Sequence, residues 1–247
     1  MSNAADNHEQ EGLLSDVDPE QDEMARNTTN LRTEDRKGDR TAEYAALAAV
    51  PVFVLVTWGI IFANDPKSLG WFAYHPILQS CAIASFTYGI LTLQPTSQPV
   101  SKAAGLQRHQ IAMFGIGIPC ILAGTAFMIY NKSLHSAPHF TSWHGTFGII
   151  TVVWLLIQVL VGGASVWFGG AALGGGMKAK AAWKYHRLSG YIVFTMTLFT
   201  AYLAGSWSTW VTGHSNSLVR FVGYTVAPVV ILLAVYTRIR PSKMKFI

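Results

Sequence analysis

Four histidines stand at the beginning of long apolar stretches, and their type and position suit the binding of a metal centre. His75, His109, His144 and His186 each belong to a different stretch. A histidine inside a membrane segment is energetically costly unless it has a partner, so it usually marks a functional site. Neutral imidazole is the commonest metal ligand among side chains and a standard axial ligand of haem iron. One histidine in each of four stretches therefore predicts a cofactor site.

The stretches that carry these histidines are long enough to cross a bilayer. Ser142–Trp167, for example, contains 26 residues without a Lys, Arg, Asp or Glu, and a membrane helix needs about 20 apolar residues. Strict two-residue alternation is absent, which excludes strands. The sequence therefore predicts an all-α integral membrane fold with six transmembrane helices. These are Tyr44–Ala63, Trp71–Leu93, His109–Tyr130, Ser142–Trp167, His186–Trp207 and Leu218–Tyr236.

The distribution of acidic residues excludes several kinds of chemistry. Eleven of the 13 Asp and Glu residues lie between Asp6 and Asp39, and no Asp or Glu follows Asp65. Carboxylate-ligated metals, general acid–base pairs and carboxylate proton relays therefore lack their reagents. Cys81 and Cys120 lie far apart without a CxxC or CxxCH motif, so the sequence indicates neither a zinc site nor a covalently attached haem.

The basic residues predict how the chain is oriented. With a cytoplasmic N-terminus, 15 of the 18 Lys and Arg residues fall in cytoplasmic segments, and the far side carries Lys67, Lys132 and Arg220. Membrane proteins keep their basic loops in the cytoplasm, so both termini are expected there. The formal net charge of +5 is then a signature of topology, and no nucleic-acid partner is expected.

Composition divides the chain into three regions. Residues 1–41 are polar and mixed in charge, which predicts a disordered cytoplasmic tail. Residues 42–240 form the predicted transmembrane domain, and residues 241–247 a short basic cytoplasmic tail. Within the first tail, Glu9–Leu14 reads EQEGLL, an acidic dileucine pattern that would sort a membrane protein to endosomal or vacuolar membranes. Acidic tails also produce such short patterns by chance.

The predicted topology pairs the histidines by depth. The helices of His75 and His144 both begin at the far face, and those of His109 and His186 both begin at the cytoplasmic face. A bare divalent ion at a two-histidine site would need further ligands, which these stretches do not supply. A haem supplies four equatorial nitrogens itself and needs two axial ligands. The pattern therefore predicts two haems, one bound by each pair.

Four histidine-bearing segments resemble those of the cytochrome b561 family. They are WFAYHPILQ (71–79), LQRHQIAMFG (106–115), HFTSWHGTFG (139–148) and KYHRLSGY (184–191), with successive histidines 34, 35 and 42 residues apart. The resemblance covers about residues 44–240 and is nearest to the compact members without an added domain. It implies a six-helix fold with two non-covalent haem b groups in the four-helix bundle of helices two to five. The implied ligand pairs are His75 with His144 and His109 with His186.

The resemblance also implies an activity, namely electron transfer from cytoplasmic ascorbate to ferric iron or monodehydroascorbate on the far side of the membrane. Dimers occur in that family, so the resemblance is also compatible with a homodimer embedded in membrane lipid. An anionic donor would dock on the basic residues beside the cytoplasmic pair, which are Arg108, Lys180, Lys184 and Arg187. The same residues would equally serve as topology-setting charges or as partners of haem propionates. Several family members carry a lysine where this chain has Gln107.

The remaining histidines and two other classes of function are the alternatives to this interpretation. His8, His135, His139 and His214 fall outside the predicted helices, where solvated loop residues are expected, and His139 is the candidate for contact with a substrate. A flavin-fed ferric reductase would carry two ligand histidines on one helix, and no second histidine follows any of the four at that spacing. A small transporter or a scaffold with histidines along its pathway is the alternative from another class.

Overall fold

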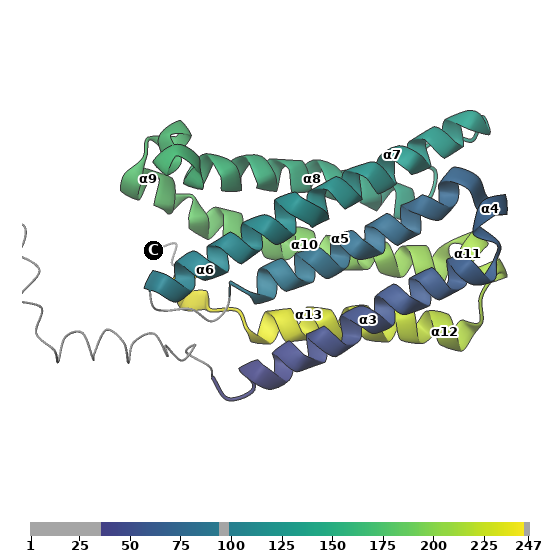
Figure 1. Ribbon diagram of the computed structural model, residues 1–247, viewed down its shortest axis with the longest axis horizontal. Coiled ribbons are helices and arrows are strands. Elements are labelled where there is room, and N and C mark those ends of the chain that lie inside the picture. The colour runs from purple at the N-terminus through teal and green to yellow at the C-terminus, as the bar shows by residue number, and fades with distance from the viewer. Residues whose placement is uncertain (1–35, 94–98, 245–247) are drawn as a thin grey trace, which may run out of the picture.

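The computed structural model describes residues 36–93 and 99–244, and within these ranges the chain is helical without a strand. Long helices run along one axis and form an elongated bundle (Figure 1). The long elements are α3 (Asp39–Ala63), α5 (Tyr74–Leu91), α8 (Trp143–Val166), α10 (Trp183–Trp207) and the run of α6 (Pro99–Gln110), η2 (Ile111–Gly117) and α7 (Ile118–Leu134). A further long helical run, the last in the chain, consists of α12 (Ser217–Phe221), η4 (Val222–Val226) and α13 (Ala227–Thr237).

Short elements connect these helices at the two ends of the bundle. They are α4 (Pro66–Leu69), η1 (Gly70–Ala73), η3 (Trp167–Leu173), α9 (Gly176–Ala181) and α11 (Thr209–Gly213), and a further short element, η5 (Pro241–Met244), follows α13. We call the end that holds the start of α3 and the end of α13 the tail side, and the opposite end, with α4 and α11, the loop side (Figure 1). Of the predicted tails at residues 1–41 and 241–247, residues 1–35, with the dileucine pattern, and residues 245–247 lie outside the described residues. Of the remainder, α3 already begins at Asp39, and Pro241–Met244 form η5.

Five of the six predicted spans correspond to helices that are long and apolar enough to cross a membrane, counted over the described residues. The second, α5, is a helix of 18 residues that carries His75, Pro76 and Gln79 near its start, and it is not among the five. Its crossing stays a prediction. The third helix differs most in its bounds, because it begins at Pro99 rather than at His109. His109 therefore lies within a continuous helical run and not at its start.

The long helices pack as antiparallel neighbours. The closest associations are α5 with α7, α8 with α10, and α3 with α13, and α3 also packs on α5. A buried core of large side chains, including Phe53, Phe86, Phe194 and Ile231, joins α3, α5, α10 and α13. At Gly205 a side chain would overlap the Tyr224 ring, so glycine allows α10 and η4 to approach closely. Because lipid is as apolar as these side chains, close van der Waals packing rather than removal from water stabilises such a bundle in a membrane.

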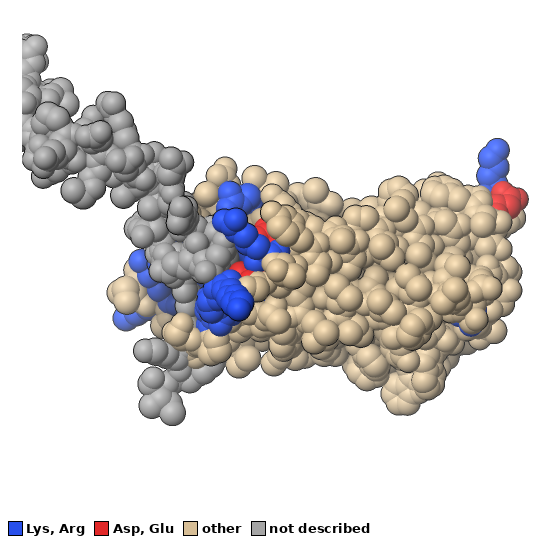
Figure 2. Space-filling model, turned by 90° about the horizontal axis from the view of Figure 1, so that it is seen from below, with Lys and Arg blue, Asp and Glu red and all other residues tan. Residues whose placement is uncertain are grey.

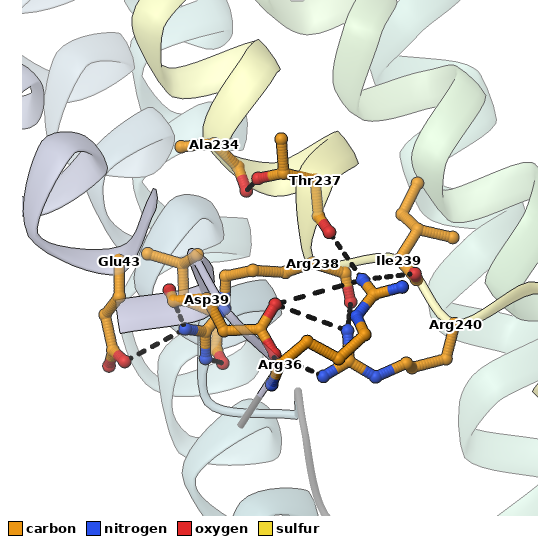
Figure 3. Close-up of polar contacts among 9 residues, drawn as sticks. Arg36, Asp39, Glu43, Ala234, Thr237, Arg238, Ile239 and Arg240 are labelled. Carbon is orange, nitrogen blue, oxygen red and sulfur yellow. Dashed lines mark hydrogen bonds and ion pairs between the residues drawn. The ribbon is translucent and has the colours of Figure 1, made fainter. Parts of the chain in front are cut away.

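A cluster of charged residues fastens α3 to the segment after α13 on the tail side (Figure 3). The Asp39 carboxylate, which is buried, pairs with Arg240 and accepts from the Arg36 backbone N–H at 2.6 Å. Arg238 is buried as well, and it donates to Asp39 O at 2.7 Å and to Glu43 Oε2 at 3.0 Å. Buried charges of opposite sign must be paired to avoid a large desolvation cost. This pairing explains why two of the few carboxylates near the spans lie at this position.

Charged side chains gather at the two ends of the bundle and leave a long uncharged surface between them (Figure 2). The larger basic group lies on the tail side, beside the chain termini of the bundle. Exposed apolar side chains occur on several of the long helices, among them Leu55 on α3, Leu160 on α8 and Leu233 on α13. A surface of this kind suits contact with lipid.

Candidate cofactor site

The four histidines meet as two pairs, one toward each end of the bundle. The ring centres of His75 and His144 are 5.9 Å apart, with the rings inclined at 76°. Those of His109 and His186 are 6.4 Å apart and inclined at 89°. We call His75 and His144 the loop-side pair and His109 and His186 the tail-side pair. All four side chains are partly buried between helices.

Each pair joins the two hairpins of the bundle. The first hairpin consists of α5 and the α6–α7 run, and the second of α8 and α10. The loop-side pair takes His75 from the first turn of α5 and His144 from the first turn of α8. The tail-side pair takes His109 from the end of α6 and His186 from the first turn of α10. A group held by either pair would therefore link the hairpins.

Within each hairpin, every histidine ring hydrogen-bonds to the neighbouring helix. Three of the partners are backbone carbonyls that face Nδ1: Gly124 O for His75 (2.9 Å), Gly89 O for His109 (3.1 Å) and Thr200 O for His144 (3.0 Å). The His186 ring bonds to the backbone of Gln158. A carbonyl can only accept, so Nδ1 carries the proton and donates, and Nε2 is left as the free nitrogen. Metal-binding histidines are typically oriented by such second contacts.

The four partners occur at a regular spacing. Gly89, Gln158 and Thr200 each lie 14 residues after the histidine of their own helix, and Gly124 lies 15 residues after His109. The extra residue coincides with η2, a π-helical turn at Ile111–Gly117 in which the Ile118 N–H bonds to Met113 O. A π turn accommodates one additional residue without rotating the rest of the helix. It therefore keeps His109 and the Gly124 carbonyl in register.

The distances and volumes suit a haem at these positions. Two imidazoles on one metal ion, each with a metal–nitrogen bond of about 2 Å and a ring centre about 1 Å further, have ring centres about 6 Å apart. A cavity of about 700 Å³ lies at the loop-side pair and is lined by His75, His144 and mostly apolar neighbours. Cofactor sites commonly measure about 300–1,000 Å³. At the tail-side pair, a Cβ at Gly162 would lie 2.8 Å from His186 Cε1, so glycine makes room for the ring.

The ligand set does not suit a bare metal ion. Across the described residues, no group of three or more His, Cys, Asp or Glu side chains is arranged to hold one. Cys81 and Cys120 are free thiols. Two imidazoles alone leave a zinc or copper ion short of ligands, whereas a haem needs only the axial pair.

A family model described as eukaryotic cytochrome b561 matches residues 74–212, a segment that contains all four histidines. The chain belongs to the cytochrome b561 family. Membership makes it a multi-pass integral membrane protein, and the cofactor that the family implies is a b-type haem. The resemblance predicted from the histidine-bearing segments is thereby confirmed.

Curated relatives of this cytochrome b561 chain are named as reductases. Transmembrane reductase CYB561D2 from Bos taurus is 28% identical over 102 residues, which is 40% of this chain and 45% of the relative. Transmembrane reductase CYB561D2 from Mus musculus is 29% identical over 125 residues, which is 48% of this chain and 54% of the relative. The chain spans about half the length of the curated relatives it matches.

The predicted substrate residues lie at both ends of this site. Arg108 precedes His109, and Lys184 and Arg187 flank His186 on α10, so these three belong to the tail side. Lys180 lies on α9 and is exposed. His139 lines the cavity of the loop-side pair.

Two residues beside the histidines were missed in the sequence. Lys132 lines the same cavity and donates to Pro138 O at 2.7 Å. Gln158 is buried against the start of α10, close to His186. The sequence did contain a signal for Gln158, because it is a polar residue in the middle of an apolar stretch.

Proposed function

We propose that the protein transfers electrons across a membrane through two non-covalent haem b groups. The donor in this proposal is cytoplasmic ascorbate, and the acceptor on the far side is ferric iron or monodehydroascorbate. The observation that carries the proposal is the presence of two histidine pairs at opposite ends of one bundle. At His75, His109 and His144 the backbone carbonyl at Nδ1 favours the tautomer that leaves Nε2 for iron. When bound, haem iron supplies the one-electron chemistry.

The side chains of the bundle hold the ligands and exclude water. His75 and His144 would bind one haem and His109 and His186 the other, with each ring oriented by the hairpin to which it belongs. The absence of any Asp or Glu after Asp65 argues against proton coupling through carboxylates. The same absence speaks against a cation-coupled transporter, the alternative function considered from the sequence.

The two ends of the bundle differ in what they offer to substrates. Arg108, Lys180, Lys184 and Arg187 place positive charge at the tail side, where an anionic donor would dock. On the loop side, His139 and Lys132 line the cavity of the histidine pair and would face the acceptor. In this proposal the tail side is cytoplasmic and all six helices cross the membrane. A homodimer and an endosomal or vacuolar location stay predictions.

Reconstitution of the full chain into sealed vesicles tests the proposal. Ascorbate is enclosed on the tail side, and ferric citrate or a monodehydroascorbate-generating system is added on the other. We expect a reduced b-type absorbance band and acceptor reduction that ceases in His109→Ala and His144→Ala variants. A correctly folded but colourless protein, or acceptor reduction unchanged in both variants, contradicts the proposal.

A further inference from the structure

Gln158 is a buried polar residue near the middle of α8, a mostly apolar helix. Its side chain is 7% exposed. A buried amide costs free energy unless its donors and acceptor are hydrogen-bonded. Gln158 therefore needs partners, and the start of α10 supplies them.

The partners of Gln158 connect it with His186. One end of the side-chain amide lies 2.8 Å from His186 Nδ1 and 3.2 Å from His186 O, and the other end contacts Ser189 Oγ and lies 3.1 Å from Gly190 N. Trp154, one turn earlier on α8, donates from Nε1 to Ser189 Oγ at 2.7 Å. A continuous polar chain thus runs from Trp154 through Ser189 and Gln158 to His186. At His75, His109 and His144 the partner of Nδ1 is a backbone carbonyl. The His186 ring also bonds to the backbone of Gln158, and the side-chain amide is a second contact that the other three rings do not show.

The orientation of this amide depends on which nitrogen of His186 carries the proton. When Nδ1 is unprotonated, the amide NH₂ group donates to it, and the amide oxygen accepts from Ser189 Oγ and Gly190 N. When Nδ1 is protonated, the same short contact requires the amide oxygen, and the NH₂ group then donates to Ser189 Oγ. Iron bound at Nε2 leaves the proton on Nδ1. Haem binding would therefore select the second orientation.

We propose that Gln158 is a positioning residue that tunes the reduction potential of the tail-side haem through His186. By accepting from Nδ1–H, the amide oxygen increases electron donation from the imidazole and stabilises the oxidised iron. Ser189 and Trp154 hold the amide in place. The inference rests on the proposed function, because it requires a haem at the tail-side pair. Its effect is confined to that haem, since the loop-side rings lack such a chain.

Substitutions of opposite character at Gln158 test this role. Gln158→Leu removes the side-chain acceptor and keeps the backbone carbonyl of residue 158, so the potential of the tail-side haem should rise. Gln158→Glu keeps an accepting oxygen and adds negative charge, so the potential should fall. Ser189→Ala removes the partner that holds the amide and should give a smaller rise. The measurement is an optical redox titration of the purified full chain, with electron paramagnetic resonance of each ferric haem.

Gln79→Leu is the matched control. The Gln79 amide belongs to the other hairpin and donates to Ile121 O at 3.2 Å and to Thr125 Oγ1 at 3.0 Å. It should leave the potential of the tail-side haem unchanged.

Several results would overturn the inference. One is a shift in the same direction for Gln158→Leu and Gln158→Glu, and another is an unchanged potential with both haems retained. If Gln158→Leu does not retain haem, the Ser189→Ala and Trp154→Phe variants test the role of Gln158 in its place. An unchanged reduction potential of the tail-side haem in both variants overturns that role. A wild-type protein without haem b contradicts the proposed function itself. A wild-type protein with two haems and an unmoved potential contradicts this inference alone.

Discussion

The hairpin of α5 and α7 and the hairpin of α8 and α10 orient their histidines by the same reciprocal bonds, but with different local structure. In the second hairpin both helices are regular between the histidine and the bonded residue, 14 positions further on. In the first hairpin the α6–α7 run has one residue more and takes it up in the π turn η2. In the second hairpin the Gln158 side chain also contacts a histidine ring and links it to Ser189. In the first hairpin the histidine rings bond to backbone carbonyls.

This difference shows that the required feature is the register of the ring and the carbonyl, not the number of residues between them. A helix turns about 100° per residue, so one uncompensated residue would move a carbonyl away from its histidine. The π turn removes this rotation. It packs against α5, where the Ser85 hydroxyl donates to Ala112 O at 2.7 Å and the Phe86 ring covers Gly117.

The largest expected effect comes from changing the length of the helices. Deleting Ile150 from α8 would rotate His144 by about 100° relative to Gln158, and we expect loss of at least one haem. Deleting Ile116 from η2 should convert the π turn into regular α-helix and leave both haems bound. Both isoleucines are exposed, at 45% and 50%, which makes them a matched pair. Haem content per chain is the measurement, and equal loss in both deletions would refute the register argument.

A smaller effect is expected from filling the space beside His186. Gly162→Val places methyl groups where the ring lies, because even a Cβ would be 2.8 Å from His186 Cε1. We expect the tail-side haem to be lost or weakly bound while the loop-side haem remains. Gly59→Ala is the control, since nothing lies within 4 Å of its added Cβ. The absorbance spectrum of each haem is the measurement. A Gly162→Val protein with an unaltered tail-side haem would contradict the assignment of His186 as a ligand of that haem.

The charged cluster on the tail side should affect stability without affecting either hairpin. Asp39→Asn removes one partner of a buried ion pair, which typically costs about 3–5 kcal/mol. Asp65→Asn, at the exposed start of α4, should cost about 1 kcal/mol or less. Thermal unfolding in detergent measures both. We expect unchanged haem spectra below the transition, and spectra altered by Asp39→Asn would show that the cluster also shapes the ligand geometry.

The smallest effect concerns the bond between α5 and the π turn. Ser85→Ala deletes the donor to Ala112 O, and one hydrogen bond contributes about 1 kcal/mol. Ser133→Ala, whose exposed hydroxyl bonds to its own helix at Ile129 O, should be nearly neutral. The unfolding midpoints of the two variants provide the comparison. A larger loss for Ser133→Ala would indicate that Ser85 does not support the turn.

Much of the bundle could be predicted because bilayer thickness and apolar composition fix the length of a spanning helix. Five predicted spans correspond to long apolar helices, and the family followed from short segments around the histidines. The depth of each histidine followed from the alternating direction of the helices. That rule places His75 beside His144 and His109 beside His186, where the structure also brings the rings together.

The remaining features depend on contacts between segments that are distant in sequence. Two examples are the bond from His75 to Gly124 O and the π turn after His109. Both depend on the packing of α5 against the α6–α7 run, and no local sequence pattern predicts them. The same holds for the buried pairing of Asp39 with Arg240, which are 201 positions apart. Their charges in the sequence indicated only topology. The bounds of the third helix were also predicted too short, because polar residues before His109 extend it beyond the apolar stretch.

The central claim is that each histidine pair binds one haem, and the haem content of the four single His→Ala variants tests it most directly. The account predicts two haems per wild-type chain. His75→Ala and His144→Ala should lose the same one, while His109→Ala and His186→Ala should lose the other. Pyridine haemochrome content and the reduced spectrum of each variant give the answer. A folded wild-type chain without haem b, or variants that group as His75 with His109, would contradict the account.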